Sequence, residues 1–211
     1  MQPEQQRILG YFIEEAKEHL QTIESALLNL QSVTSDQEHL NEVFRAAHSV
    51  KGGAAMLGLY GMQHISHRLE DYFKVLKEHP VSVDAKLESL FFKGFDALNQ
   101  LTQELEASFE IPEEMEKQVL SDVEPVFLEL QEHLIALVGP SADLSELLSA
   151  SSPDKASASQ AASTDTDPEA VDAFFVPTFW QSCARHFSIF SRAVRRTAAS
   201  LWWKFVKLFH K

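Results

Sequence analysis

The sequence from Leu40 to Leu59 reads LNEVFRAAHSVKGGAAMLGL. Residues on an α-helix follow one another at about 100°, so this stretch can be sorted into two sides. One side is apolar and carries Val43, Ala46, Val50, Ala54 and Leu57. The other side carries His48, with Phe44, Lys51, Gly52 and Ala55 within about 60° of it. The stretch therefore predicts an amphipathic helix whose histidine points away from the core.

The outward side suits the transfer of a phosphoryl group between proteins. The unperturbed pKa of imidazole, about 6.5, leaves His48 mostly uncharged and nucleophilic near neutral pH. One turn further on, the ammonium of Lys51 is placed to neutralise phosphoryl oxygens. Gly52 and Gly53 have no side chains, so a partner protein could approach the ring closely. Each glycine also costs about 1 kcal/mol in a helix, which indicates a reason beyond folding.

Each of these features has a plainer explanation when it is taken alone. A single helical histidine is usually solvated or structural, and runs of small residues usually let two helices pack closely. The combination of histidine, lysine and paired glycines in one helical register favours phosphoryl transfer over those explanations.

The run from Phe44 to Gly53 resembles the phosphoacceptor helix of histidine phosphotransfer (HPt) domains. The resemblance extends from about Glu4 to about Leu105 and is strongest to the amino-terminal domain of chemotaxis-type histidine kinases. It implies that a separate ATP-binding kinase domain phosphorylates His48. It also implies that the phosphoryl group then passes to an aspartate of a response-regulator receiver domain.

The segment His67-Arg68-Leu69-Glu70 is similar to the family's second motif, His-x-x-Glu. The resemblance implies that Glu70 hydrogen-bonds the unphosphorylated nitrogen of His48 and orients the ring. It also leads us to expect that His67 joins Lys51 in supporting the phosphoryl group. Periodicity alone leaves this open, because a solvated polar face would give the same pattern.

Apolar residues repeat at three-to-four spacing along most of the first 138 residues, which predicts consecutive helices. The first is expected over residues 4–31, with the core series Ile8, Phe12, Ala16, Leu20, Ile23, Leu27 and Leu30. Ser35-Asp36 should cap the helix bearing His48, and Gly58 should help to end it. Further helices are expected over residues 60–78, 84–105 and 112–138. Short connections and the lack of a strand pattern predict an all-α fold, an antiparallel four-helix bundle with an additional fifth helix.

Composition divides the rest of the chain. We expect the HPt bundle in residues 1–108, the additional helix in 109–138, a flexible Ser/Ala/Asp-rich linker in 139–172 and a basic, aromatic tail in 173–211. All 31 acidic residues precede the tail, which contains seven of the 18 basic ones. An amphipathic tail helix over 178–211 is typical of contact with an anionic membrane surface. Folding back on the acidic bundle, or an abnormal carboxyl end, would explain the same composition.

The net charge of −13 argues against nucleic-acid binding, and the lone Cys183 allows no internal disulfide. With no evident signal peptide, we expect a monomeric cytoplasmic phosphocarrier without cofactor or metal. The sequence contains no Gly-rich nucleotide-binding signature, so autophosphorylation is not expected. Three alternatives stay open: a metal-binding bundle using His64, His67 and Asp71 with His48, a purely scaffolding bundle, and a truncated fragment of a chemotaxis-type kinase.

Overall fold

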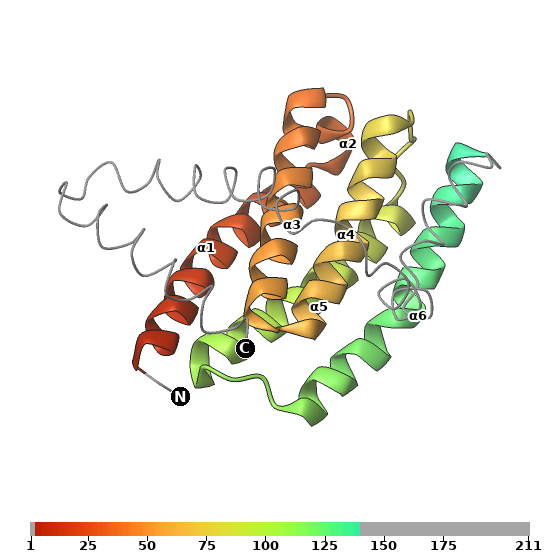
Figure 1. Ribbon diagram of the computed structural model, residues 1–211. Coiled ribbons are helices and arrows are strands. Elements are labelled where there is room, and N and C mark those ends of the chain that lie inside the picture. The colour runs from red at the N-terminus through yellow and green to blue at the C-terminus, as the bar shows by residue number, and fades with distance from the viewer. Residues whose placement is uncertain (1–2, 140–211) are drawn as a thin grey trace, which may run out of the picture. The chain divides into compact units, whose positions relative to one another are not determined.

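The computed structural model describes residues 3–139, which form an all-helical domain (Figure 1). Its helices are α1 (Pro3–Leu27), α2 (Leu30–Val33), α3 (Gln37–Leu57), α4 (Tyr60–Glu78), α5 (Ala85–Ser108) and α6 (Glu113–Val138). The predicted linker and the predicted basic tail, including its expected membrane-contacting part, lie outside the described residues. No helix among residues 3–139 is both long and apolar enough to cross a bilayer.

Four long helices close into an antiparallel bundle, as predicted. Helix α1 packs against α3 and α5, and α4 also packs against α3 and α5, so the four apolar stripes meet in one core. Helix α6 packs on the outside of this bundle, against α4 and α5 (Figure 1). The predicted all-α bundle with an additional helix is therefore confirmed.

Local signals account for both ends of α3 and for the start of α5. The carboxylate of Asp36 accepts hydrogen bonds from the backbone N–H groups of Glu38 and His39, which caps α3. At the other end of α3, Gly58 adopts a left-handed conformation with φ of 71°, where glycine is favoured. Asp84 caps α5 by accepting from the N–H of Leu87 at 2.7 Å. These caps agree with the predicted boundaries.

The first predicted helix is wrong in one respect, because it does not run without a break to residue 31. It ends at Leu27, and the short α2 follows a turn at Leu28 and Asn29. At this turn the side chain of Asn29 donates to the carbonyl of Ser25. The prediction that Ile8 lies in the core is also wrong, because Ile8 is 38% exposed and its neighbour Leu9 is buried instead.

Helix α6 is fixed to α4 by aromatic and polar contacts. The buried hydroxyl of Tyr72 donates to the carbonyl of Phe127 at 2.9 Å. The buried guanidinium of Arg68 lies 5.4 Å from the ring centroid of Tyr72 and 5.7 Å from that of Phe127, within cation–π range. The carboxylate of Glu116 accepts from the backbone N–H of Gly61. These contacts hold α6 against α4.

Candidate functional site

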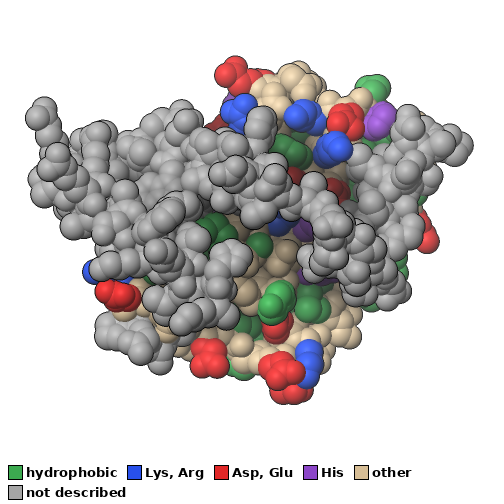
Figure 2. Space-filling view, viewed as in Figure 1, with side chains coloured by type: hydrophobic (Ala, Val, Ile, Leu, Met, Phe, Trp, Pro, Cys, Tyr) green, Lys and Arg blue, Asp and Glu red, His purple; other side chains and the backbone are tan. Residues whose placement is uncertain are grey.

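Helix α3 presents His48 at the surface because its other side is packed. The buried residues of α3 are Leu40, Val43, Ala46, Ala47, Val50, Gly53 and Ala54. The side chain of His48 is 44% exposed. Where grey atoms do not cover this view, histidine and Lys/Arg side chains reach the surface with Asp/Glu side chains among them (Figure 2). The expected outward orientation of His48 thus agrees with its position in the structure.

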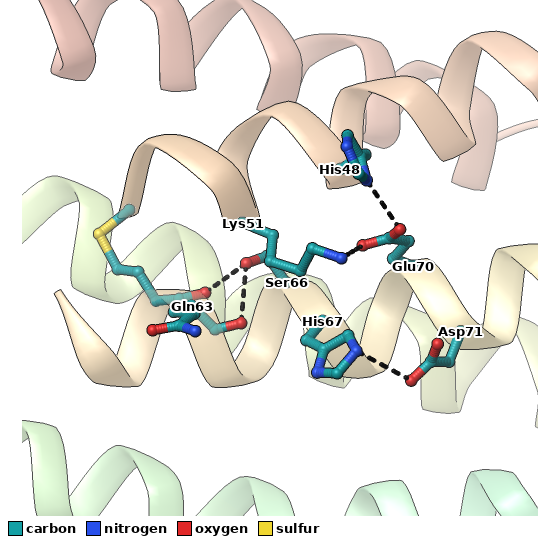
Figure 3. Close-up of polar contacts among 8 residues, drawn as sticks. His48, Lys51, Gln63, Ser66, His67, Glu70 and Asp71 are labelled. Atoms are coloured by element: carbon teal, nitrogen blue, oxygen red, sulfur yellow. Dashed lines mark hydrogen bonds and ion pairs between the residues drawn. The ribbon is translucent and has the colours of Figure 1, made fainter. Parts of the chain in front are cut away.

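Helix α4 brings Glu70 against His48. The Nδ1 atom of His48 lies 2.9 Å from Oε1 of Glu70, at hydrogen-bond distance (Figure 3). The other carboxylate oxygen, Oε2, lies 2.6 Å from Nζ of Lys51 and forms an ion pair with it. Only 9% of the Glu70 side chain is exposed. One nearly buried carboxylate therefore joins the histidine and the lysine of α3.

The electrostatics of Glu70 decide which nitrogen of His48 is free to react. Burial alone would raise the pKa of Glu70, but contacts with His48 and the positive charge of Lys51 outweigh it and hold the pKa below its ordinary value. Glu70 is therefore a carboxylate at neutral pH and can only accept a hydrogen bond. The Nδ1 atom of His48 must then carry the proton. In the neutral imidazole, the lone pair is left on Nε2.

The predicted partner Lys51 lies in this network, whereas the structure pairs His67 with another residue. The Nε2 atom of His67 lies 3.7 Å from Oδ2 of Asp71, and its ring is directed toward that carboxylate (Figure 3). The ammonium of Lys51 forms an ion pair with Glu70, the same carboxylate that contacts His48. Support of a phosphoryl group by Lys51 and His67 stays a prediction.

The two glycines of α3 differ in their surroundings. Gly52 is partly exposed, whereas Gly53 is buried. A Cβ atom at position 53 would lie 2.6 Å from Cε2 of Phe12, which is closer than real Cβ contacts allow. The expectation that Gly53 serves partner access is therefore wrong. Its missing side chain makes room for α1, while access at Gly52 stays a prediction.

The imidazole of His48 also contacts an aromatic ring, which no sequence motif predicted. The ring of Phe44 stacks on the imidazole, with centroids 6.3 Å apart and planes 20° apart. The ammonium of Lys77, from α4, lies 4.8 Å from the centroid of the Phe44 ring. The helical spacing placed Phe44 on the face of His48, but no sequence signal indicated Lys77.

The alternative metal site does not form. His64 interacts with Glu124 of α6, with Nε2 and Oε2 3.1 Å apart, whereas His67 faces Asp71 on its own helix. Within residues 3–139, no group of three or more histidine, cysteine, aspartate and glutamate side chains is arranged to hold a metal ion. The metal-binding alternative therefore finds no support in the geometry.

Comparison with known proteins supports the resemblance to histidine phosphotransfer domains. Residues 7–108 match the model of the Hpt domain family. This segment is similar to the chemotaxis protein CheA of Bacillus subtilis, with 33% identity over 97 residues that cover 46% of this chain and 14% of the relative. CheA of Klebsiella aerogenes is 36% identical over 89 residues, which cover 42% of this chain and 14% of the relative. The match thus spans about one seventh of these relatives' length.

A solved structure shows the same fold. It is the phosphorylated P1 domain of CheA3 in complex with CheY6 from R. sphaeroides. The likeness has a TM-score of 0.52 and 23% sequence identity, and it covers 63% of this chain and 98% of that one. At this identity the comparison establishes the helical architecture alone.

Proposed function

We propose that the Hpt domain is a phosphocarrier whose His48 accepts a phosphoryl group and passes it on. The carrying observation is the 2.9 Å contact between Nδ1 of His48 and Glu70, together with the partial exposure of the same imidazole. The contact keeps the proton on Nδ1 and leaves the lone pair on Nε2. The partial exposure of the ring lets a partner reach it. The match to the Hpt domain family supports this proposal.

In the accepting step, the Nε2 lone pair of His48 attacks the γ-phosphorus of ATP bound to a separate kinase domain. An N–P bond forms as the bond between the γ-phosphorus and the bridging oxygen breaks, and ADP leaves. The ring gains positive charge because Nδ1 keeps its proton. The carboxylate of Glu70 lies beside that nitrogen and stabilises the charge. In this proposal Lys51, which pairs with the same carboxylate, offers its ammonium to the new phosphoryl oxygens.

In the donating step, an aspartate oxygen of a response-regulator receiver domain attacks the phosphorus. The N–P bond breaks, and its electron pair returns to Nε2 of His48. The neutral imidazole bonded to Glu70 is restored, so the carrier is ready for another cycle. In this proposal the chain holds the phosphoryl group, while ATP chemistry belongs to a kinase domain and phosphoryl acceptance to a receiver. A cytoplasmic location, and contact of residues 178–211 with a membrane surface, stay predictions.

The test is incubation of the full chain with labelled ATP and purified kinase domains of chemotaxis-type histidine kinases. We expect label that is lost in acid and survives base, as phosphohistidine does. His48→Gln should accept no label and should change the free energy of unfolding by no more than about 0.5 kcal/mol, because the side chain is partly exposed. His39→Gln is the matched control, since His39 is an exposed histidine of the same helix.

Two results would decide against the proposal. Label retained by His48→Gln would place the acceptor elsewhere in the chain. Absence of acid-labile phosphate from the unaltered chain, with kinase domains that label their own Hpt domains, would favour the scaffolding alternative.

A further inference from the structure

An aromatic ring and a second lysine contact the His48 site outside the Glu70 network. Phe44 lies one turn before His48 on α3, and its ring is nearly parallel to the imidazole. Lys77 lies two turns after Glu70 on α4 and directs its ammonium at the Phe44 ring. The chain of contacts therefore runs from α4 through Phe44 to the reactive imidazole.

The hydrogen bond to Glu70 does not by itself fix the plane of the imidazole. It restrains Nδ1, but the ring can still tilt about the line that joins Nδ1 to Oε1 while the distance of 2.9 Å is kept. Such a tilt would swing the lone pair of Nε2 away from an approaching phosphorus. A transfer reaction is sensitive to this because reacting orbitals must be aligned. A second contact on the face of the His48 ring would remove this freedom.

Phe44 supplies a contact of that kind. Its ring centroid lies 6.3 Å from that of His48, within the range of offset aromatic stacking. Phe44 is only half-buried, so packing alone does not restrict its side chain to one rotamer. The ammonium of Lys77 at 4.8 Å from the ring centroid favours one of those rotamers through a cation–π interaction. Lys77 thereby ties the aromatic ring of α3 to α4.

We propose that Phe44 is a positioning residue for His48 and that Lys77 holds Phe44 in place. Glu70 then sets the proton on Nδ1, and Phe44 sets the plane in which Nε2 points outward. This inference rests on the proposed function, because it assigns the stacked ring a part in phosphoryl transfer. The accepting and donating steps need no further reactant.

The test measures the kinetics of labelling of full-length variants by a chemotaxis-type kinase domain. Phe44→Leu should lower kcat about 3- to 10-fold with little change in KM, because it removes alignment and not docking. Phe44→Tyr should stay within about 2-fold of the unaltered chain, since it keeps the aromatic face. Lys77→Met should lower kcat about 2- to 5-fold, because it removes the cation. Lys77→Arg keeps the cation, so its kcat should equal that of the unaltered chain.

A control separates the local contact from the effect of net charge. Lys93→Met removes one positive charge from an exposed position of α5 and should leave the rate unchanged. Equal losses in Lys77→Met and Lys93→Met would overturn the role of Lys77. Rates of Phe44→Leu and Lys77→Met equal to that of the unaltered chain would overturn the whole inference.

A second measurement needs no phosphoryl transfer. The ring current of Phe44 should shift the carbon-bound imidazole protons of His48 in the NMR spectrum of the unphosphorylated chain. This shift should disappear in Phe44→Leu and diminish in Lys77→Met, while the proton on Nδ1 is retained. Unchanged imidazole shifts in both variants would reject the positioning role. If the unaltered chain took no label at all, the proposed function would fail, and the NMR result would still decide whether Phe44 orients the ring.

Discussion

The ring of Phe12 fills the space that a side chain at Gly53 would occupy. A Cβ atom there would lie 2.6 Å from Cε2 and 2.7 Å from Cδ2 of Phe12. Both residues are buried where α1 packs against α3, on the side of α3 away from His48. Gly53 thus sets how closely the first helix approaches the helix that carries the histidine.

Replacing Gly53 with alanine should destabilise the fold. Alanine gains up to about 1 kcal/mol in helix propensity over glycine. Overpacking of a well-filled core costs about 1 to 3 kcal/mol, so it should outweigh that gain. We expect Gly53→Ala to lower the free energy of unfolding by about 1 kcal/mol, measured by urea denaturation.

Gly10 is the matched control for this substitution. It also lies inside a helix, but a Cβ atom at position 10 would meet nothing within 4 Å. Gly10→Ala should therefore stabilise the fold by about 0.5 to 1 kcal/mol. Equal effects of the two alanines would show that Gly53 is not needed for close packing.

Signals close together in the sequence predicted most of the fold. Asp36 and Gly58 mark the two ends of α3, because a capping carboxylate and a left-handed glycine act on their own helix. The apolar spacing also predicted a helix over residues 112–138, and α6 spans Glu113–Val138. The break after Leu27 was missed because the apolar spacing continues through it to Leu30.

The site was predictable only in part, because its contacts depend on how two helices are aligned. Periodicity placed His48 on the outer face of its helix, but the pairing with Glu70 was expected only from the family resemblance. The contact of Lys77 with Phe44 depends on the alignment of α3 with α4, to which no local pattern points. The burial of Gly53 could have been read from the same periodicity, because at 100° per residue it lies about 140° from His48. Its contact with Phe12, which is distant in sequence, could not.

Removing the carboxylate of Glu70 should slow phosphorylation without eliminating it. In Glu70→Ala, Nδ1 of His48 loses its acceptor at 2.9 Å, so the ring is free to adopt the other tautomer. We expect the initial rate of labelling to fall roughly 10- to 100-fold, as when a carboxylate that orients a metal-binding imidazole is lost. Glu78→Ala is the control, because Glu78 is an exposed carboxylate of the same helix. A rate equal to that of the control would remove Glu70 from the mechanism.

The hydroxyl of Tyr72 should contribute to the attachment of α6. It is buried and donates to the carbonyl of Phe127, and burial raises the pKa of Tyr72 well above its usual range, so it stays protonated. Tyr72→Phe should lower the free energy of unfolding by about 1 to 2 kcal/mol in urea. Tyr60, which is 73% exposed, provides the control, and Tyr60→Phe should change stability by less than about 0.5 kcal/mol. Equal stabilities of the two variants would contradict this contribution.

The ion pairing of Glu70 should make part of the stability depend on pH. Although burial raises its pKa, contacts with His48 and Lys51 lower it more, so the pKa in the folded chain lies below the ordinary value of 4.5. A carboxylate of this kind stabilises the fold fully above its unfolded pKa, and the effect is lost as pH falls through the folded pKa. The stability difference between the unaltered chain and Glu70→Gln should therefore be constant from pH 7 to about 5 and shrink below about 4.5.

Urea denaturation of both proteins between pH 7 and about 3.5 measures this difference. The pKa values of Asp36, Asp84 and Glu129 are also lowered, by hydrogen bonds to backbone N–H groups for the two aspartates and by Lys86 for Glu129. These three carboxylates are present in both proteins, so their contributions cancel in the comparison. A difference that stayed the same down to about pH 3.5 would mean that Glu70 is not held as a carboxylate by His48 and Lys51.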